Sequence, residues 1–105
     1  MVVSFEKEYL KELYENGKVK NKKYRFQPEV ILKYKRRIDT LINASNIESL
    51  LPIVSLNYEV LRGDKKGISS IRVDKRYRIE FFVSETEEEP VLTVCNILEL
   101  SNHYK

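Results

Sequence analysis

Residues 56–83, LNYEVLRGDKKGISSIRVDKRYRIEFFV, contain the alternating pattern that decides the fold. Apolar and polar side chains alternate over 58–61, 68–73 and 77–83, which is the period of strands with one buried face. Short turn-rich segments, 62–67 and 74–76, separate them. Such connections join antiparallel strands, so we expect a meander. A fourth strand over 91–98 follows the acidic loop 85–89 and Pro90.

The first half of the chain predicts one strand and several helices. Residues 2–5 are mostly β-branched, which favours a strand. A first helix ends at Asn16-Gly17 and a second opens at Pro28. Ser45 or Asn46 caps a short third helical turn that ends before Pro52. The second helix has one apolar stripe and one basic face, which we interpret as solvent-facing; the stripe is Val30, Ile31, Tyr34, Ile38, Leu41 and Ile42, and the basic face Lys33, Lys35, Arg36 and Arg37. We therefore expect an α+β fold, in which an N-terminal strand and helices pack on one face of a mainly antiparallel, twisted sheet.

Length and composition indicate a single domain over residues 1–105. The chain has one cysteine, Cys95, in an apolar run, which is typical of a core residue in a reducing compartment. It has no long apolar run and no secretory signal at its start, so we expect a cytoplasmic protein that does not bind membranes. One cysteine, one histidine and three glycines argue against a zinc site and a phosphate-binding loop, and we expect no metal or cofactor.

Charge is unevenly distributed along the chain. The net charge is only +3, but residues 57–78 hold seven basic and three acidic side chains. Residues 79–99 hold six acidic side chains and no basic one. Basic side chains gathered on strands and one loop suit nucleic-acid phosphates, although a solvated surface would show the same composition.

Three side chains could together perform acid–base chemistry. Alternation places Glu59 and Arg78 on the face of the sheet that points away from the core, and His103 follows the last strand. A carboxylate, a guanidinium and an imidazole can cleave RNA without a metal: one accepts the 2′-OH proton, one stabilises the phosphorane and one protonates the leaving oxygen. A surface ion pair and an exposed terminal histidine are the alternative interpretation.

Residues 58–67, followed by 68–73 and by Tyr77-Arg78-Ile79-Glu80-Phe81, resemble the RelE/ParE toxin superfamily, and within it the HigB-like plasmid-maintenance killer proteins. The shared pattern is a leucine–basic–glycine–aspartate loop, a serine-containing strand and an aromatic-Arg-aliphatic-x-Phe strand. The resemblance covers residues 56–105 well and the helical half by architecture. It implies a RelE-like fold.

The resemblance also implies roles for individual residues. HigB proteins usually have a histidine where Glu59 stands and end in aspartate-tyrosine-histidine, whereas Glu59, Arg78 and the terminal His103-Tyr104 resemble the YoeB branch. Glu59 is then the general base, Arg78 the phosphate stabiliser, His103 the general acid, and Tyr104 a stacking or orienting group. The phosphate-binding residues are expected to be Arg62, Lys65, Lys66, Arg72 and Arg76.

The function implied is that of a type II toxin, a ribosome-dependent mRNA endonuclease that inhibits translation. Its partners would be the ribosome, mRNA and a cognate antitoxin, expected to be a HigA-like helix-turn-helix protein. Two alternatives stay open, a ParE-like gyrase poison without nuclease chemistry and a non-catalytic relic that binds only an antitoxin.

Overall fold

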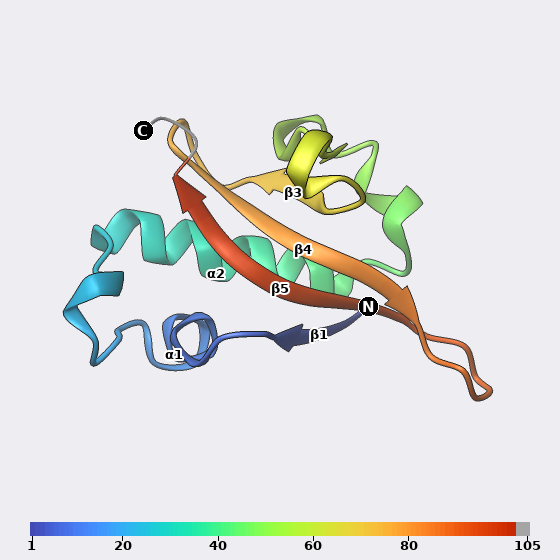
Figure 1. The fold of residues 1–105 in the computed structure, drawn as a ribbon, viewed down its shortest axis with the longest axis horizontal. Coiled ribbons are helices and arrows are strands. Elements are labelled where there is room, and N and C mark those ends of the chain that lie inside the picture. Colours follow the sequence, from blue (N-terminus) through green and yellow to red (C-terminus); the bar gives the residue numbers. More distant parts are fainter. Residues whose placement is uncertain (103–105) are drawn as a thin grey trace.

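Five strands form one sheet in the order β1-β5-β4-β3-β2 in a computed structural model that describes residues 1–102 (Figure 1). The strands are β1 (Val2–Phe5), β2 (Glu59–Val60), β3 (Ser69–Arg72), β4 (Tyr77–Glu85) and β5 (Thr93–Asn102). β2 to β5 form the antiparallel meander, and β1 pairs parallel with β5. The predicted α+β fold with a mainly antiparallel sheet is confirmed.

Helix α1 ends and helix α2 begins at the residues that the sequence indicates. Helix α1 (Glu8–Asn16) ends at Gly17, whose φ of 72° is the left-handed conformation that glycine adopts readily. Helix α2 (Pro28–Asn43) has Pro28 in its first turn, where the missing N–H is not needed. The hydroxyl of Tyr34 donates to the carbonyl oxygen of Leu10 at 2.8 Å and ties α2 to α1.

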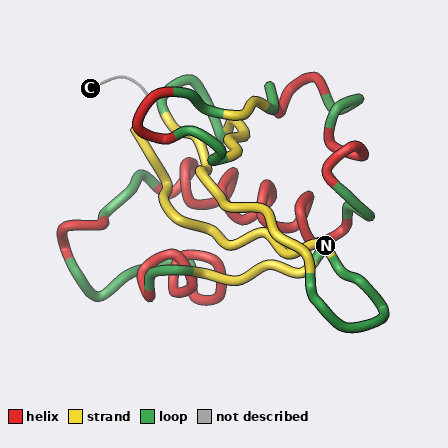
Figure 2. Tube along the Cα trace, turned by 45° about the vertical axis from the view of Figure 1, so that its right-hand side comes forward, coloured by secondary structure: helices red, strands yellow, loops and turns green. Residues whose placement is uncertain are grey.

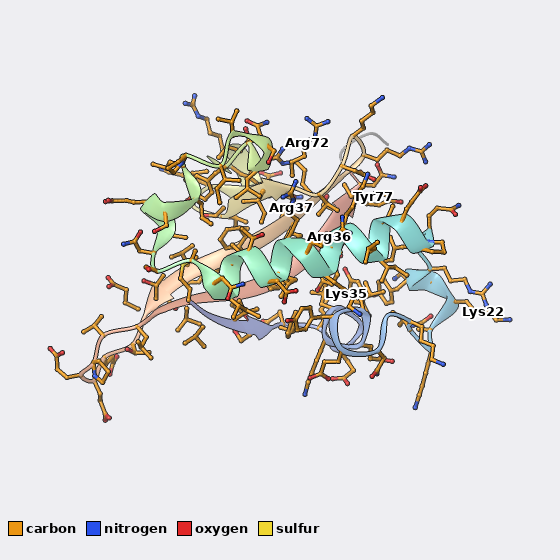
Figure 3. The ribbon with its side chains drawn as sticks, turned by 180° about the vertical axis from the view of Figure 1, so that it is seen from behind. Lys22, Lys35, Arg36, Arg37, Arg72 and Tyr77 are labelled. Carbon is orange, nitrogen blue, oxygen red and sulfur yellow. The ribbon has the colours of Figure 1, made fainter. Side chains whose placement is uncertain are left out.

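One face of the sheet is covered and forms the core. Helix α2 lies behind the sheet in Figure 1 and in front of it in Figure 3, where the molecule is seen from behind. Its Tyr34, Ile38 and Leu41 are buried with sheet residues of the covered face, among them Ile71, Ile79, Phe81 and Ile97. Cys95 is also fully buried, and burial raises the pKa of its thiol to about 11, as expected of a core cysteine. We call the opposite side the open face, because neither α1 nor α2 covers it.

The boundaries of several elements differ from those expected. β5 begins at Thr93 and continues to Asn102, four residues beyond the expected end, because it pairs with β4 as far as Tyr77. The third helical turn is a 3₁₀ helix, η2 (Ile47–Leu50), and Asn46 is its cap. β2 is an edge strand of two residues, so Val60 stays 54% exposed. The loop between β4 and β5 projects beyond the sheet (Figure 2). No helix in residues 1–102 is long and apolar enough to cross a membrane.

Candidate active site on the open face

Arg78 is a buried arginine held in one orientation on the open face. Its Nε donates to Ser70 Oγ at 2.5 Å, and its Nη2 donates to the carbonyl oxygens of Asn57, at 2.7 Å, and Ser70, at 3.3 Å. Nη1 donates to no residue within 1–102. The guanidinium is therefore fixed through one edge and keeps donors for a further anion.

Strand pairing and one left-handed residue place the groups that hold Arg78. Ser70 is the Cα partner of Glu59 across β2 and β3, so both side chains lie on the same face. Asn57 follows η3 (Val54–Leu56) and has a φ of 44°, a left-handed conformation that asparagine tolerates better than most residues. The Asn57 carbonyl accepts a hydrogen bond from Arg78 Nη2.

Glu59 lies beside Arg78 without a hydrogen bond to it. Glu59 Oε1 is 3.7 Å from Arg78 Nη2, an ion pair longer than a hydrogen bond. The Glu59 side chain is 47% exposed, whereas that of Arg78 is 9% exposed. An exposed carboxylate next to a buried, fixed cation can accept a proton from a substrate while the cation stabilises negative charge.

The electrostatics of Arg78 combine four influences. Burial lowers the pKa of its guanidinium, Glu59 raises it, Arg72 lowers it and Glu80 raises it, with a net lowering. An arginine stays protonated in proteins nonetheless. Arg72 is the Cα partner of Arg78 across β3 and β4, so two like charges are close together at this edge of the site.

The basic loop after β2 is partly neutralised. It contains the 3₁₀ helix η4 (Gly63–Lys65), and Lys65 Nζ donates to both carboxylate oxygens of Glu80 at 3.0 Å. Arg62 and Lys66 are exposed and form no ion pair with any described residue. The ion pair with Glu80 holds Lys65 on the open face and partly offsets its positive charge.

Arg76 belongs to a different surface from Glu59, and Arg72 lies where the two surfaces meet. Both arginines line a cavity of about 540 Å³ beside α2, and Arg72 also lines an adjoining cavity of about 360 Å³. Figure 3 shows Arg72 close to Arg36 and Arg37 of α2, on the helix side of the molecule. The structure therefore divides the predicted phosphate-binding residues between two surfaces.

His103 and Tyr104 lie outside the described residues. The described chain ends at Asn102, the Cα partner of Tyr77, and Ser101 is the partner of Arg78. In residues 1–102 no group of three histidine, cysteine or carboxylate side chains is placed to hold a metal ion.

Sequence reasoning missed the residues that hold Arg78. Ser70 could have been found, because the period of two places it on the open face with Arg72. No sequence signal indicated the Asn57 carbonyl, because its position depends on how the 54–57 turn packs beneath β3.

Comparisons with known proteins agree with this architecture. Residues 3–93 match the family model described as a RelE-like toxin of the type II toxin–antitoxin system HigB. A solved structure, a YoeB/ParE toxin from Agrobacterium tumefaciens, is similar with a TM-score of 0.56 at 17% identity, over 99% of this chain and 100% of that chain. No curated protein matches the sequence. The matched family model covers most of the chain, so this protein belongs to the HigB-like family of RelE-like toxins and is the toxin of a type II toxin–antitoxin module.

Proposed function

We propose that this toxin is a metal-independent endoribonuclease that cleaves mRNA on the ribosome. The observation that carries the proposal is the arrangement of Arg78 and Glu59. Arg78 is buried and held by Ser70 and Asn57, and the exposed Glu59 carboxylate lies 3.7 Å from it. A surface ion pair needs no such fixed, buried cation, whereas charge stabilisation in a transition state does.

The proposed reaction is attack of a ribose 2′-OH on the adjacent phosphate. Glu59 accepts the 2′-OH proton, and the resulting oxygen forms a bond to phosphorus. Negative charge that develops on the phosphoryl oxygens is stabilised by Arg78. His103 donates a proton to the 5′-oxygen as its bond to phosphorus breaks, which leaves a 2′,3′-cyclic phosphate and a 5′-hydroxyl. Each acid–base group contributes about 10²- to 10⁴-fold to the rate.

The role proposed for His103 rests on its position in the sequence. His103 directly follows Asn102, which pairs with the residue next to Arg78. An unperturbed imidazole has a pKa of about 6.5, so the rate should fall at high pH as the acid loses its proton. Tyr104 is proposed to stack on or orient the substrate.

The openness of the site supports the proposed dependence on the ribosome. Glu59 is half exposed on a sheet face that neither helix covers, so a flexible message needs an external scaffold to hold it in line for attack. Arg62, Lys65 and Lys66 are proposed to contact phosphates around this site.

The module needs a partner that restrains the toxin. A type II toxin implies a cognate antitoxin, and we propose a HigA-like helix-turn-helix protein. The toxin is proposed to act in the cytoplasm as a single domain over residues 1–105.

Primer extension on cellular mRNA after a short pulse of expression tests the proposal. The expected result is new 5′ ends within translated regions, and no new ends in the same message when its start codon is removed. Intact mRNA together with gyrase-linked DNA breaks would instead identify a ParE-like poison. Growth arrest without either lesion would contradict both activities.

A further inference from the structure

A groove on the helix side of the molecule is lined by six basic side chains of residues 1–102. Two adjoining cavities, of about 360 and 540 Å³, share Lys33, Arg72 and Asp74 in their walls. We call this surface the basic groove, and its cations are Lys33, Arg36 and Arg37 of α2, Arg72 of β3, and Lys75 and Arg76 of the β3–β4 turn. On α2 the three residues stand at positions i, i+3 and i+4 and so share a face; Figure 3 shows Arg36 and Arg37 on the helix.

The cations of the basic groove have no ion-pair partner among the described residues. Within residues 1–102, none of the six forms an ion pair, whereas Lys7, Lys65 and Arg78 each have a glutamate partner. Two acidic side chains, Glu29 and Asp74, also line the groove. Asp74 is used by the turn itself, because its Oδ1 accepts from the backbone N–H groups of Arg76 and Tyr77 at 2.8 and 2.9 Å.

Two of the arginines are anchored in a way that leaves their outer donors available. Arg37 Nε donates to the Arg72 carbonyl at 3.0 Å, and Arg72 Nε donates to the Asp74 carbonyl at 3.2 Å. The Nη groups of both residues donate to no residue of the described chain. Burial lowers the pKa of Arg37, and repulsion from the charge of Arg72 lowers it further. An anion bound in the groove would relieve this repulsion.

We propose that the basic groove binds the phosphate backbone of double-stranded RNA, as a docking surface separate from the cleavage site. The inference rests on the proposed function, since a ribosome presents such RNA to a bound toxin. Single-stranded RNA is bound largely through stacking on several aromatic side chains, and among the described residues Tyr77 is the one aromatic side chain in these two cavity walls. Double-stranded RNA is recognised through its backbone and shape, which suits exposed arginines and lysines.

An acidic protein segment fits the groove less well. Protein interfaces depend on apolar and aromatic anchors that fill pockets. The aliphatic residues that the described chain places in these walls, Val30 and Val73, are 4% and 3% exposed and offer almost no surface. The ring of Tyr77 is partly buried and packs edge-on against Phe26.

The test compares two variants that each lose two positive charges. Lys33→Gln/Arg36→Gln removes them from the groove, and Lys11→Gln/Lys35→Gln removes them from α1 and from another face of α2. The probe is a labelled RNA hairpin with a stem of about 16 base pairs, titrated by fluorescence anisotropy between 50 and 200 mM salt. We expect the groove variant to bind about tenfold more weakly, with a logarithmic salt slope reduced by about two. The control variant should bind as the wild type does.

Several outcomes would overturn the groove assignment. Wild-type affinity in the groove variant would do so, as would equal losses in both variants, which would indicate non-specific charge. A loss of binding to a polyglutamate peptide but not to the hairpin would indicate an acidic protein partner instead. The hairpin carries no message and needs no cleavage, so this result is separate from the fate of the proposed nuclease activity. Unchanged circular dichroism checks that both variants fold.

Discussion

Two basic surfaces of this toxin meet at Arg72, and they differ in whether their cations are buried and paired. On the open face, Arg78 is buried, hydrogen-bonded to Ser70 and Asn57, and close to Glu59. In the basic groove, six cations line the walls without an ion pair in the described chain. A fixed, desolvated charge acts on a transition state, whereas exposed unpaired charges bind a polyanion with strong salt dependence. Residues of the open face should therefore control the rate of mRNA cleavage, and residues of the groove should control the affinity for RNA.

The largest effect is expected from Glu59→Gln. The substitution keeps the size of the side chain and removes its basicity, so single-turnover cleavage of ribosome-bound mRNA should fall by about 10²- to 10⁴-fold. Binding of the RNA hairpin should not change, because Glu59 lies outside the groove. A near-wild-type rate would remove Glu59 from the mechanism and with it the division between the two surfaces.

Arg78→Ala should lower the same single-turnover rate by about 10²- to 10³-fold. Arg78→Lys should be nearly as slow, because an ammonium group cannot reproduce the planar contacts to Ser70 and Asn57. Removal of the side chain also leaves partners unbonded, so urea unfolding should show a loss of about 1–3 kcal/mol. If hairpin affinity falls as much as the rate does, Arg78 belongs to RNA docking instead.

Arg72→Gln probes the residue that both surfaces share. We expect hairpin affinity to fall roughly three- to tenfold, with a salt slope reduced by about one. Thermal stability should hold or rise slightly, since Arg72 lowers the pKa of both Arg37 and Arg78 by repulsion. Anisotropy and a melting curve measure the two effects. Reduced stability with unchanged binding would show that Arg72 is structural.

Glu99→Gln tests a third charged cluster, in which the charges are paired. Burial raises the pKa of Glu99, but hydrogen bonds from Lys7, at 2.7 Å, and from Tyr9 outweigh it and lower the pKa below its usual value. The ionised form is therefore the stabilising one. We expect a loss of about 1 kcal/mol at pH 7, allowing for partial exposure.

The pH dependence of the stability difference between wild type and Glu99→Gln serves as the control for this prediction. Wild type gains stability from Glu99 above the unfolded-state pKa and loses it as pH falls through the lower folded-state pKa. Urea unfolding of wild type and variant should therefore converge in acid. A difference that persists below pH ~3 would assign the effect to packing.

The smallest effect separates two neighbouring lysines. Lys65→Ala should cost about 0.5 kcal/mol of unfolding free energy more than Lys66→Ala, because only Lys65 has a described carboxylate partner, Glu80. Paired thermal melts at low salt measure this, and high salt should reduce the difference. Equal stabilities would mean that the Glu80 contact contributes nothing in solution.

Local patterns in the sequence were enough to predict most of the fold. Alternation identified the strands around Arg78, and Gly17 and Pro28 marked helix boundaries, because strand and helix periods are properties of neighbouring residues. The same alternation placed Glu59 and Arg78 on one face, and the structure brings them together. The end of β5 could not be predicted in this way, because its last residues adopt strand conformation only by pairing with β4.

The sequence by itself determined the α+β architecture, the toxin family and the face on which Glu59 and Arg78 lie. Only the tertiary structure decided which charges are paired. Lys65 meets Glu80, and Arg78 meets the Asn57 carbonyl, whereas Arg37 meets a carbonyl of Arg72 and no carboxylate in the described chain. Lys33, Arg36 and Arg37 read as an ordinary solvent-facing helix surface until α2 packs beside the β3–β4 turn. The physical reason is range: periodicity is set by adjacent residues, but the energy of a charge depends on every group that folding brings near it.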